Sequence, residues 1–405
     1  MDSTLLVIGA GLAGAKAAAA ARERGFTGRV VLVGAETRRP YERPPLSKDV
    51  LRGKAEPESA HVHEEGFYAA NDVELVTATE VRELDVAGRR AVLADGGSIA
   101  YDSVVLATGA RPRRLDVPGA DLDGVHYLRT LDDAARLRAA IGTGARVVVV
   151  GAGWIGSEVA SSARAMGADV CVVDPAPVPL QRVLGTEVGT VFRSLHADNG
   201  VALRLGVGIA ELHGGRSVDK VVLSDGRTEA ADVVVVGIGV EPCTELAEAA
   251  GLHVRDGIVV DEHLHSAPGV YAAGDVANAW HPHYGRHVRV EHWANALNQG
   301  ATAGRNAVGS HEAYLRLPYF YSDQYDLSLE YLGVADARDD VTIRGSLAER
   351  EFVAFYAREG IVDAALTVNV HDVVDDLKRI VTDRVRTDAP GLLDPAVPLS
   401  DVGRR

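Results

Sequence analysis

The 405-residue sequence predicts an α/β protein that contains two related βαβ folds and a C-terminal α+β domain. Two observations support this prediction. A strand, a glycine turn, a helix and a second strand occur in this order twice along the chain. In addition, a hairpin and the buried strand that follows it recur 130 positions apart. An internal duplication of this kind indicates two related domains rather than one.

The first βαβ pattern lies at the start of the sequence. Thr4 to Ile8 predicts a buried strand, the alanine-rich segment Ala13 to Arg24 predicts a helix, and Arg29 to Val33 predicts a second strand. The turn between the first strand and the helix is Gly9 to Gly14, with the sequence Gly-Ala-Gly-Leu-Ala-Gly. This order implies parallel strands joined by a right-handed crossover.

The same pattern recurs in the middle of the chain. Arg146 to Val150 predicts a strand, Gly156 to Met166 a helix and Asp169 to Val173 the next strand. The turn is Gly151 to Gly156, with the sequence Gly-Ala-Gly-Trp-Ile-Gly. The chain therefore carries two copies of one supersecondary unit.

The segments that close each fold are also similar. Leu93 to Gly96 and Leu223 to Gly226 both end in Asp-Gly, which predicts a hairpin with a tight turn. Each hairpin precedes a buried strand, predicted at Val104 to Ala107 in one copy and Val234 to Val236 in the other. A glycine-bearing loop follows each strand.

The character of the sequence changes at about Leu317. Aromatic residues cluster at Pro318 to Tyr321, strands are predicted at Glu351 to Tyr356 and Ala364 to Val368, and a last helix at His371 to Val381. This segment has the size of a small separate domain. We therefore expect one domain from residues 1–112 and 245–316, a second from residues 113–244 and a third from residues 317–405.

Both glycine turns have the spacing of a dinucleotide-binding motif. The first glycine permits the tight turn, the second lets a pyrophosphate approach the backbone, and the third lets helix and strand pack closely. The helix N-terminus supplies amide donors and a positive dipole. Glu36 follows Gly14 by 22 residues and Asp174 follows Gly156 by 18 residues, where an acid can bind ribose hydroxyls. The sequence thus predicts two dinucleotide sites.

The two sites predict two cofactors that act together. Nicotinamide donates hydride and a flavin accepts it, so FAD at the first site and NAD at the second form the natural pair. Asp174 would accept a hydrogen bond from a ribose 2′-hydroxyl and repel a 2′-phosphate, and no arginine follows it before Arg182. This favours NADH over NADPH. The alternative is that Asp174 only caps a loop.

Composition limits the remaining functions. The formal net charge of -15 argues against a nucleic-acid partner. No apolar run is long enough to span a bilayer, and Met1 to Ser3 contains no signal-like stretch, so we expect a cytoplasmic protein. Cys171 lies in an apolar run and is expected to be a buried structural thiol. We predict no metal site, because the loop that carries His281, His283, His287 and His292 contains no cysteine.

Several short motifs share their pattern with one known family. They are Arg43 to Lys48 (Arg-Pro-Pro-Leu-Ser-Lys), Ala107 to Pro112, Tyr127 to Thr130, Gly156 to Glu158, Val236 to Gly239, Ala273 to Val276, Glu291 to Trp293 and Tyr321 to Asp326. These motifs resemble those of the flavin-dependent ferredoxin reductases of bacterial cytochrome P450 and Rieske oxygenase systems. Rubredoxin reductases and apoptosis-inducing factors are similar. The resemblance spans nearly the whole chain and implies two Rossmann-like dinucleotide-binding domains (glutathione-reductase-like) plus a C-terminal α+β domain.

The resemblance also implies roles for individual residues. Lys48 would lie near the N5 side of the flavin, and Glu158 would pair with Lys48 near the nicotinamide, within about 4 Å. Arg129 could instead cap a helix, and Trp293 could fill a core. Together with the glycine motifs, the FAD-site residues are Gly9, Gly11, Leu12, Ala13, Gly14, Ala35, Glu36, Arg43, Lys48, Val81, Ala107, Thr108, Gly109, Arg129, Gly274, Asp275, Glu291, His292 and Trp293. The NAD-site residues are Gly151, Gly153, Trp154, Ile155, Gly156, Glu158, Asp174, Gly237, Ile238 and Gly239.

The sequence departs from the family pattern at two places. Many relatives carry an acid directly after the glycine that ends the second strand, whereas here Ala35 precedes Glu36. Glu36 either takes over the ribose contact or points into solvent. Relatives often place tryptophan in the aromatic segment near the flavin, where this chain has Phe320 and Tyr321. An aromatic stacking surface is expected there, with altered electronic properties.

The implied function is electron transfer from NADH through FAD to a 2Fe-2S ferredoxin that serves a cytochrome P450 or another oxygenase. Reduction of disulfides or peroxides is disfavoured, because Glu36 to Leu51 contains no cysteine beside the flavin. A membrane NADH–quinone oxidoreductase is disfavoured, because the tail Asp394 to Arg405 has no apolar face. A rubredoxin reductase and a redox-responsive binding module of the apoptosis-inducing-factor type stay open as alternatives. We expect a monomer or a weak homodimer.

Overall fold

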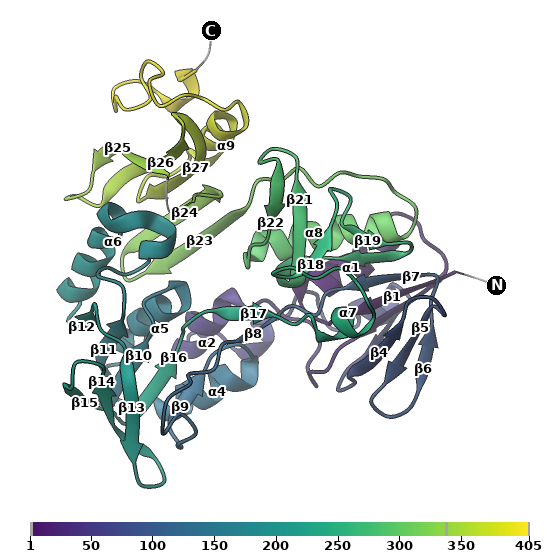
Figure 1. Cartoon of the computed structure of the whole chain (residues 1–405), viewed down its shortest axis with the longest axis horizontal. Helices are drawn as coiled ribbons and strands as arrows, with labels where there is room; N and C mark the ends of the chain where they lie inside the picture. Colours follow the sequence, from purple (N-terminus) through teal and green to yellow (C-terminus); the bar gives the residue numbers. More distant parts are fainter. Residues whose placement is uncertain (1–2, 337–338, 404–405) are drawn as a thin grey trace. The chain divides into compact units, whose positions relative to one another are not determined.

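The computed structural model of the chain describes residues 3–336 and 339–403 (Figure 1). The chain forms two compact units, which we treat separately. The first comprises residues 1–43, 58–111 and 240–318, and the second comprises residues 44–57, 112–239 and 319–405. The division into three domains stays a prediction. Met1, Asp2 and the last two residues of the tail, on which the expectations about a signal and an anchor partly rested, lie outside the described residues.

The first unit is built on a six-stranded sheet with the order β19-β20-β7-β1-β2-β3. Strands β20, β7, β1, β2 and β3 are parallel, and β19 pairs with β20 in the antiparallel direction. The bounds are β1 Thr4–Ile8, β2 Arg29–Val33, β3 Val73–Val76, β7 Ser103–Leu106, β19 His265–Ala267 and β20 Val270–Ala272. The first two strands have the predicted bounds.

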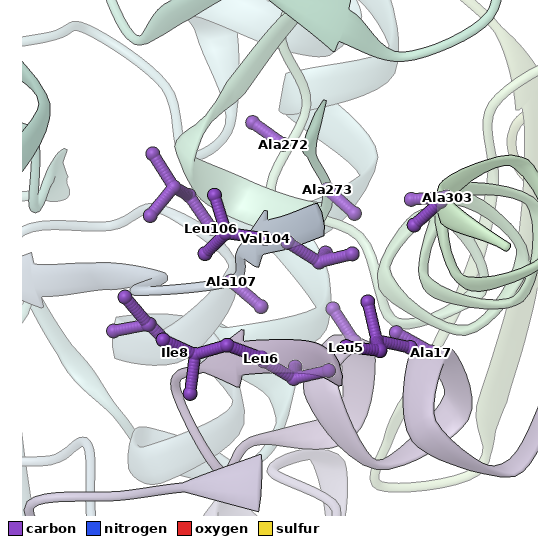
Figure 2. Packing of buried hydrophobic residues seen from close by; sticks show 14 of the residues in the cluster. Leu5, Leu6, Ile8, Ala17, Val104, Leu106, Ala107, Ala272, Ala273 and Ala303 are labelled. Atoms are coloured by element: carbon purple, nitrogen blue, oxygen red, sulfur yellow. The ribbon is translucent and has the colours of Figure 1, made fainter. Parts of the chain in front are cut away.

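Two helices of this unit pack at very short distance. Helix α1 (Leu12–Glu23) begins one residue before the prediction, and it lies against α8 (Trp293–Ala307). A Cβ atom at Gly300 would lie 2.2 Å from the carbonyl oxygen of Ala13, and one at Gly304 would lie 2.1 Å from that of Ala17. Only glycine permits this approach. Figure 2 shows Ala17 and Ala303 of the two helices beside the buried side chains of β1 and β7.

Smaller elements complete the first unit. A three-stranded antiparallel sheet and a second three-stranded sheet add to the main sheet. Their strands are β4 Val81–Asp85, β5 Arg90–Leu93 and β6 Ser98–Ala100, and β18 Ile258–Val260, β21 Ala277–His281 and β22 Arg286–Val288. The short helices are α3 Phe67–Ala70, α7 Glu245–Ala249 and the 3-10 turn η3 Gly274–Val276. The 3-10 turn η2 Pro57–Ala60 begins at the unit boundary.

The second unit contains the second βαβ fold. Its five strands are parallel, in the order β12-β11-β10-β16-β9. Their bounds are β9 Val125–Tyr127, β10 Arg146–Val150, β11 Asp169–Asp174, β12 Ala202–Leu205 and β16 Val233–Val236. The helices are α2 Asp49–Arg52, α4 Leu131–Ala140, α5 Trp154–Ala165 and α6 Gln181–Asp198, with the 3-10 turn η1 at Pro44–Ser47. Helix α5 starts two residues before the prediction, because the glycine turn itself begins the helix.

The predicted hairpins are confirmed in both copies. Strands β5 and β6 pair in the antiparallel direction across Gly96, whose φ is 88°. Strands β14 (Val218–Leu223) and β15 (Thr228–Ala230) pair across Gly226, whose φ is 86°. Such left-handed backbone favours glycine. Strand β13 (Ile209–Gly214) extends the second hairpin, and β8 (Ala110–Pro112) and β17 (Val240–Pro242), also 130 positions apart, form a two-stranded ribbon.

An antiparallel five-stranded sheet ends the second unit, in the order β23-β24-β27-β26-β25. The bounds are β23 Tyr319–Gln324, β24 Leu327–Gly333, β25 Asp340–Ser346, β26 Glu351–Arg358 and β27 Ile361–Val368. Side chains of α6 share one apolar core with this sheet, including Leu184, Phe192, Leu366 and Tyr356. Helix α9 (Val374–Thr382) contacts β24 and β27, and η4 covers Leu399–Asp401.

The last helix begins later than predicted. We expected it to start at His371, but Asp372 has a φ of 59°, which a right-handed helix excludes. The strands β26 and β27 are also longer than predicted, because cross-strand pairing extends beyond the apolar runs. Within residues 3–336 and 339–403, no helix is both long and apolar enough to cross a membrane.

Candidate cofactor sites and the buried lysine–glutamate pair

The first glycine turn leaves space in front of the start of α1. Gly9 has a φ of 112°, and a Cβ there would lie 2.1 Å from the carbonyl oxygen of Ala107. A Cβ at Gly14 would lie 1.9 Å from the carbonyl oxygen of Gly9. By contrast, a Cβ at Gly11 would meet no described atom within 4 Å. The open space faces the first amides and the positive end of the helix, which fits a pyrophosphate.

The second glycine turn has the same geometry. A Cβ at Gly151 would lie 2.4 Å from the carbonyl oxygen of Gly237, and one at Gly156 would lie 2.0 Å from that of Gly151. A Cβ at Gly153, directly before α5, would again meet nothing within 4 Å among the described residues. The loop after β16 therefore contacts this turn as the loop after β7 contacts the first. Ile155 and Ile238, at the mouth of the turn, are exposed apolar residues.

Asp174 lies at the end of β11 and is fixed by two backbone amides. Its Oδ2 accepts a hydrogen bond from the amide of Ala152 at 2.6 Å, and its Oδ1 accepts one from Ala176 at 2.7 Å. The carboxylate thus does cap the loop, which was the alternative role. Each carboxylate oxygen keeps a second acceptor position, so a ribose contact stays a prediction.

Glu36 contacts two residues of the following segment. It accepts hydrogen bonds from the hydroxyl of Tyr41 and from Nη2 of Arg43 at 3.3 Å. Burial alone would lower the pKa of Arg43, but the charges of Tyr41, Glu36 and Asp275 raise it. The Glu36 side chain is 40% exposed, so it is only half in solvent. The structure therefore links three of the predicted FAD-site residues.

Other predicted FAD-site residues lie around the start of α1 and α8. A Cβ at Gly274 would lie 2.9 Å from the Cβ of Ala13, so η3 contacts the first turn of α1. Burial lowers the pKa of His292 to about 4, although Asp275 raises it. Glu291 forms an ion pair with Arg289 at 2.5 Å. Gln299, which the sequence analysis missed, fixes η3 by accepting a hydrogen bond from the amide of Gly274 at 3.0 Å.

Four further predicted FAD-site residues are Thr108, Val81, Trp293 and Arg129. Thr108 donates a hydrogen bond to the carbonyl oxygen of Cys243 at 2.7 Å. Val81 begins β4, and Trp293 begins α8. Arg129 belongs to the second unit, where Thr130 and Asp133 form the capping box of α4. The roles of these residues at FAD stay predictions.

Lys48 and Glu158 form a buried ion pair in the second unit. The distance from Lys48 Nζ to Glu158 Oε1 is 2.8 Å, and the side chains are 13% and 6% exposed. The predicted contact, between residues 110 positions apart, is confirmed. Two serines that the sequence analysis quoted only as parts of motifs, Ser47 and Ser322, also donate hydrogen bonds to Glu158.

The aromatic segment lies next to this pair. Lys48 Nζ lies 5.8 Å from the centre of the Tyr321 ring, and Phe320 packs edge-on against Trp154 with ring centres 4.6 Å apart. Tyr321 is 40% exposed. Aromatic side chains, including the half-exposed Tyr321, therefore lie beside the ion pair.

Two further expectations concern cysteine and metal. Cys171 is buried, and burial raises the pKa of its thiol to about 11, which fits an unreactive structural thiol. His281 is buried and its Nε2 contacts the carbonyl oxygen of Arg316 at 3.1 Å. In the described part of the chain, no group of three or more histidine, cysteine or acidic residues is arranged to hold a metal ion.

Comparison with known proteins identifies the class. Residues 3–300 match the family described as pyridine nucleotide-disulphide oxidoreductase, and residues 319–403 match the family described as reductase C-terminal. The chain therefore belongs to the pyridine nucleotide-disulphide oxidoreductases, which are FAD-dependent. Within that class it belongs to the ferredoxin–NAD(+) reductases, as its individual relatives establish.

These relatives match over nearly their full length. The chain is 39% identical to the ferredoxin–NAD(+) reductase component of an anthranilate 1,2-dioxygenase system from Burkholderia cepacia, covering 97% of this chain and 98% of that relative. It is 36% identical to putidaredoxin reductase from Pseudomonas putida, covering 99% and 97%. The structure of a covalent putidaredoxin reductase–putidaredoxin complex matches with a TM-score of 0.94 and 37% identity, covering 98% of this chain and 97% of that one. The predicted fold class and family are confirmed.

Proposed function

We propose that this chain takes hydride from NADH through FAD and passes the electrons to a 2Fe-2S ferredoxin that serves a cytochrome P450 or another oxygenase. The observation that carries this proposal is the presence of two open glycine turns in one chain, each at the start of a helix after a parallel strand. One turn holds the pyrophosphate of each dinucleotide. Bound FAD supplies the change from two-electron to one-electron transfer.

The residues of the chain bind and orient the two cofactors. Asp174, fixed by two amides, selects the ribose of NADH by accepting from its hydroxyl. Lys48 presents its ammonium to the flavin, where a cation stabilises negative charge on the reduced ring. Glu158 holds this ammonium in place. Cys171 is not a candidate thiol for this step, because it is buried and burial raises the pKa of its thiol to about 11.

The ferredoxin partner is supported by the relatives, whose names pair them with ferredoxins of dioxygenase systems or with putidaredoxin. A rubredoxin reductase or a redox-responsive binding module of the apoptosis-inducing-factor type are the alternatives. Turnover distinguishes the binding module, which retains its reduced flavin, from an electron carrier, which passes its electrons on rapidly. A cytoplasmic location is part of the proposal, because its reductant, NADH, is an intracellular coenzyme.

The cofactor assignment is tested on the purified protein. Denaturation should release FAD, and anaerobic addition of NADH should bleach the flavin absorbance. Release of FMN, or a colourless protein that FAD does not reconstitute, would contradict the assignment. Equal bleaching by NADPH would contradict the assigned electron donor.

A further inference from the structure

Glu158 accepts hydrogen bonds from three side chains. Its Oε1 accepts from Lys48 Nζ at 2.8 Å and from the hydroxyl of Ser322 at 2.6 Å, and its Oε2 accepts from the hydroxyl of Ser47 at 2.5 Å. Both serines are 1% exposed. Each of these donors occupies one acceptor position of the Glu158 carboxylate. The two serines therefore contact the same carboxylate as Lys48 does.

The two serines are themselves held firmly. The backbone carbonyl of Ser47 accepts a hydrogen bond from the hydroxyl of Ser162 at 2.6 Å, which ties η1 to α5. Ser322 lies within β23, where the antiparallel register places it opposite Leu329 of β24. Next to it, the amide of Tyr325 donates to the hydroxyl of Ser161 at 3.0 Å, which ties the end of β23 to α5. Each donor segment is thus connected to α5 by a further hydrogen bond.

Glu158 has the ammonium of Lys48 as an ionisable neighbour, and its helix packs on apolar strands. From the start of α2 it faces Lys48, and Tyr321 of β23 has its ring near Lys48. Strands β10 and β11 present apolar side chains to α5, including Val149 and Val172. Removing a hydroxyl donor from a buried carboxylate therefore favours its protonated form, and a neutral Glu158 no longer fixes the ammonium of Lys48.

We propose that Ser47 and Ser322 are positioning residues that keep Glu158 ionised and immobile, so that Lys48 stays aimed for hydride transfer. This inference rests on the proposed function of the Lys48–Glu158 pair. The C-terminal sheet then helps to position Lys48, because Ser322 belongs to β23. The sheet supplies a hydrogen-bond donor to the pair as well as packing against α6.

The test compares Ser322→Ala and Ser47→Ala with the unmutated flavoprotein. The rate of flavin reduction by NADH is measured from pH 5 to pH 9 by rapid mixing, together with FAD content and Tm. One lost hydrogen bond to a charged group corresponds to about one pH unit or more. We expect the acid limb of the rate profile to move up by about one unit in each variant, with KM for NADH changed less than about twofold.

Two further variants keep the test decisive. Ser328→Ala removes a serine of the same sheet that donates to Asp323 instead, and its profile should match that of the unmutated protein. Ser322→Thr keeps the hydroxyl, so its pH profile for flavin reduction should match that of the unmutated protein. If both alanine variants bind FAD and give unshifted profiles, the inference is wrong. If Ser322→Ala does not fold, an unshifted profile for Ser47→Ala overturns it. If the unmutated protein is not reduced by NADH, the proposed function itself fails.

Discussion

At the scale of single residues, the Lys48–Glu158 pair is the most sensitive point of the site. Removing one partner leaves the other charge buried without compensation, which costs about 3–5 kcal/mol. We expect Glu158→Ala to lower both the free energy of unfolding and the rate of flavin reduction, and Lys48→Ala to do the same. The double variant Lys48→Met/Glu158→Gln should lose less stability than the sum of the single changes.

Denaturant unfolding and rapid-mixing kinetics on the same samples measure these effects. The control is the exposed ion pair of Arg216 and Asp123, in which Nε of Arg216 lies 2.8 Å from Oδ2 of Asp123. Arg216→Ala should change stability by less than about 1 kcal/mol. Unchanged FAD content, hydride transfer and stability in both single variants of the buried pair would show that the pair has no role in the site.

Asp174 should determine the choice of nicotinamide. Its carboxylate accepts from two amides of the turn and would also accept from the ribose 2′-hydroxyl. We expect Asp174→Asn, which removes the negative charge, to lower kcat/KM for NADH by about 10- to 100-fold, since a hydrogen bond to a charged group is worth about 1.5–3 kcal/mol. The same change should narrow the preference over NADPH. If the preference for NADH over NADPH is the same in Asp174→Asn as in the unmutated protein, residues other than Asp174 select the nicotinamide cofactor.

His196 should make stability depend on pH. It is 1% exposed, its Nδ1 lies 3.0 Å from the hydroxyl of Tyr325, and burial lowers its pKa to about 4. Because the unfolded state binds the proton more readily between pH 6.5 and 4, stability is full above pH 6.5 and falls as the pH drops through this window. The loss from this residue is about 1.4 kcal/mol per pH unit, up to about 3 kcal/mol.

The His196→Gln variant checks this assignment. Urea unfolding at pH 7 and pH 5 should show a smaller difference in the variant than in the unmutated protein. Equal pH dependence in the His196 variant and the unmutated protein would rule out His196 as a source of acid sensitivity.

At the scale of elements, the contact of α1 with α8 is the tightest constraint in the first unit. A methyl group at Gly304 would lie 2.1 Å from the carbonyl oxygen of Ala17, and this backbone atom cannot move alone. We expect Gly304→Ala to push α8 away and to cost about 1–3 kcal/mol in stability, with weaker FAD retention. Gly215→Ala, where a Cβ would meet no described atom within 4 Å, should be neutral. Tm and flavin content distinguish the two variants.

Elements that depend on local sequence were predictable. The strands Thr4–Ile8, Arg29–Val33 and Arg146–Val150 have the predicted bounds, because apolar runs and flanking glycines define them. The start of α9 was not predictable, because no feature of the sequence indicates the left-handed backbone conformation at Asp372. The contact of α6 with the C-terminal sheet was not predictable either, because an apolar face on a helix does not indicate which surface it packs against.

The candidate site was predictable only where its residues form motifs with a characteristic spacing or match a family pattern. The glycine motifs and Asp174 follow from spacing, and the Lys48–Glu158 contact was expected from a family resemblance. The donors Ser47 and Ser322 were not recognised, because Ser322 is 164 positions from Glu158 and serine has no characteristic spacing in the sequence. Long-range hydrogen bonds of small polar residues need the three-dimensional structure.

At the scale of the whole molecule, the proposed function requires the chain to carry electrons from NADH to a one-electron protein acceptor. The decisive measurement is anaerobic reduction of a candidate 2Fe-2S ferredoxin, if one is found beside the gene, followed by its own absorbance, with catalytic amounts of the flavoprotein. We expect rapid reduction with NADH and about two ferredoxins reduced per NADH, since hydride carries two electrons. A flavin that NADH reduces fully, but that stays reduced while the ferredoxin remains oxidised, would contradict it and favour a redox-responsive binding module.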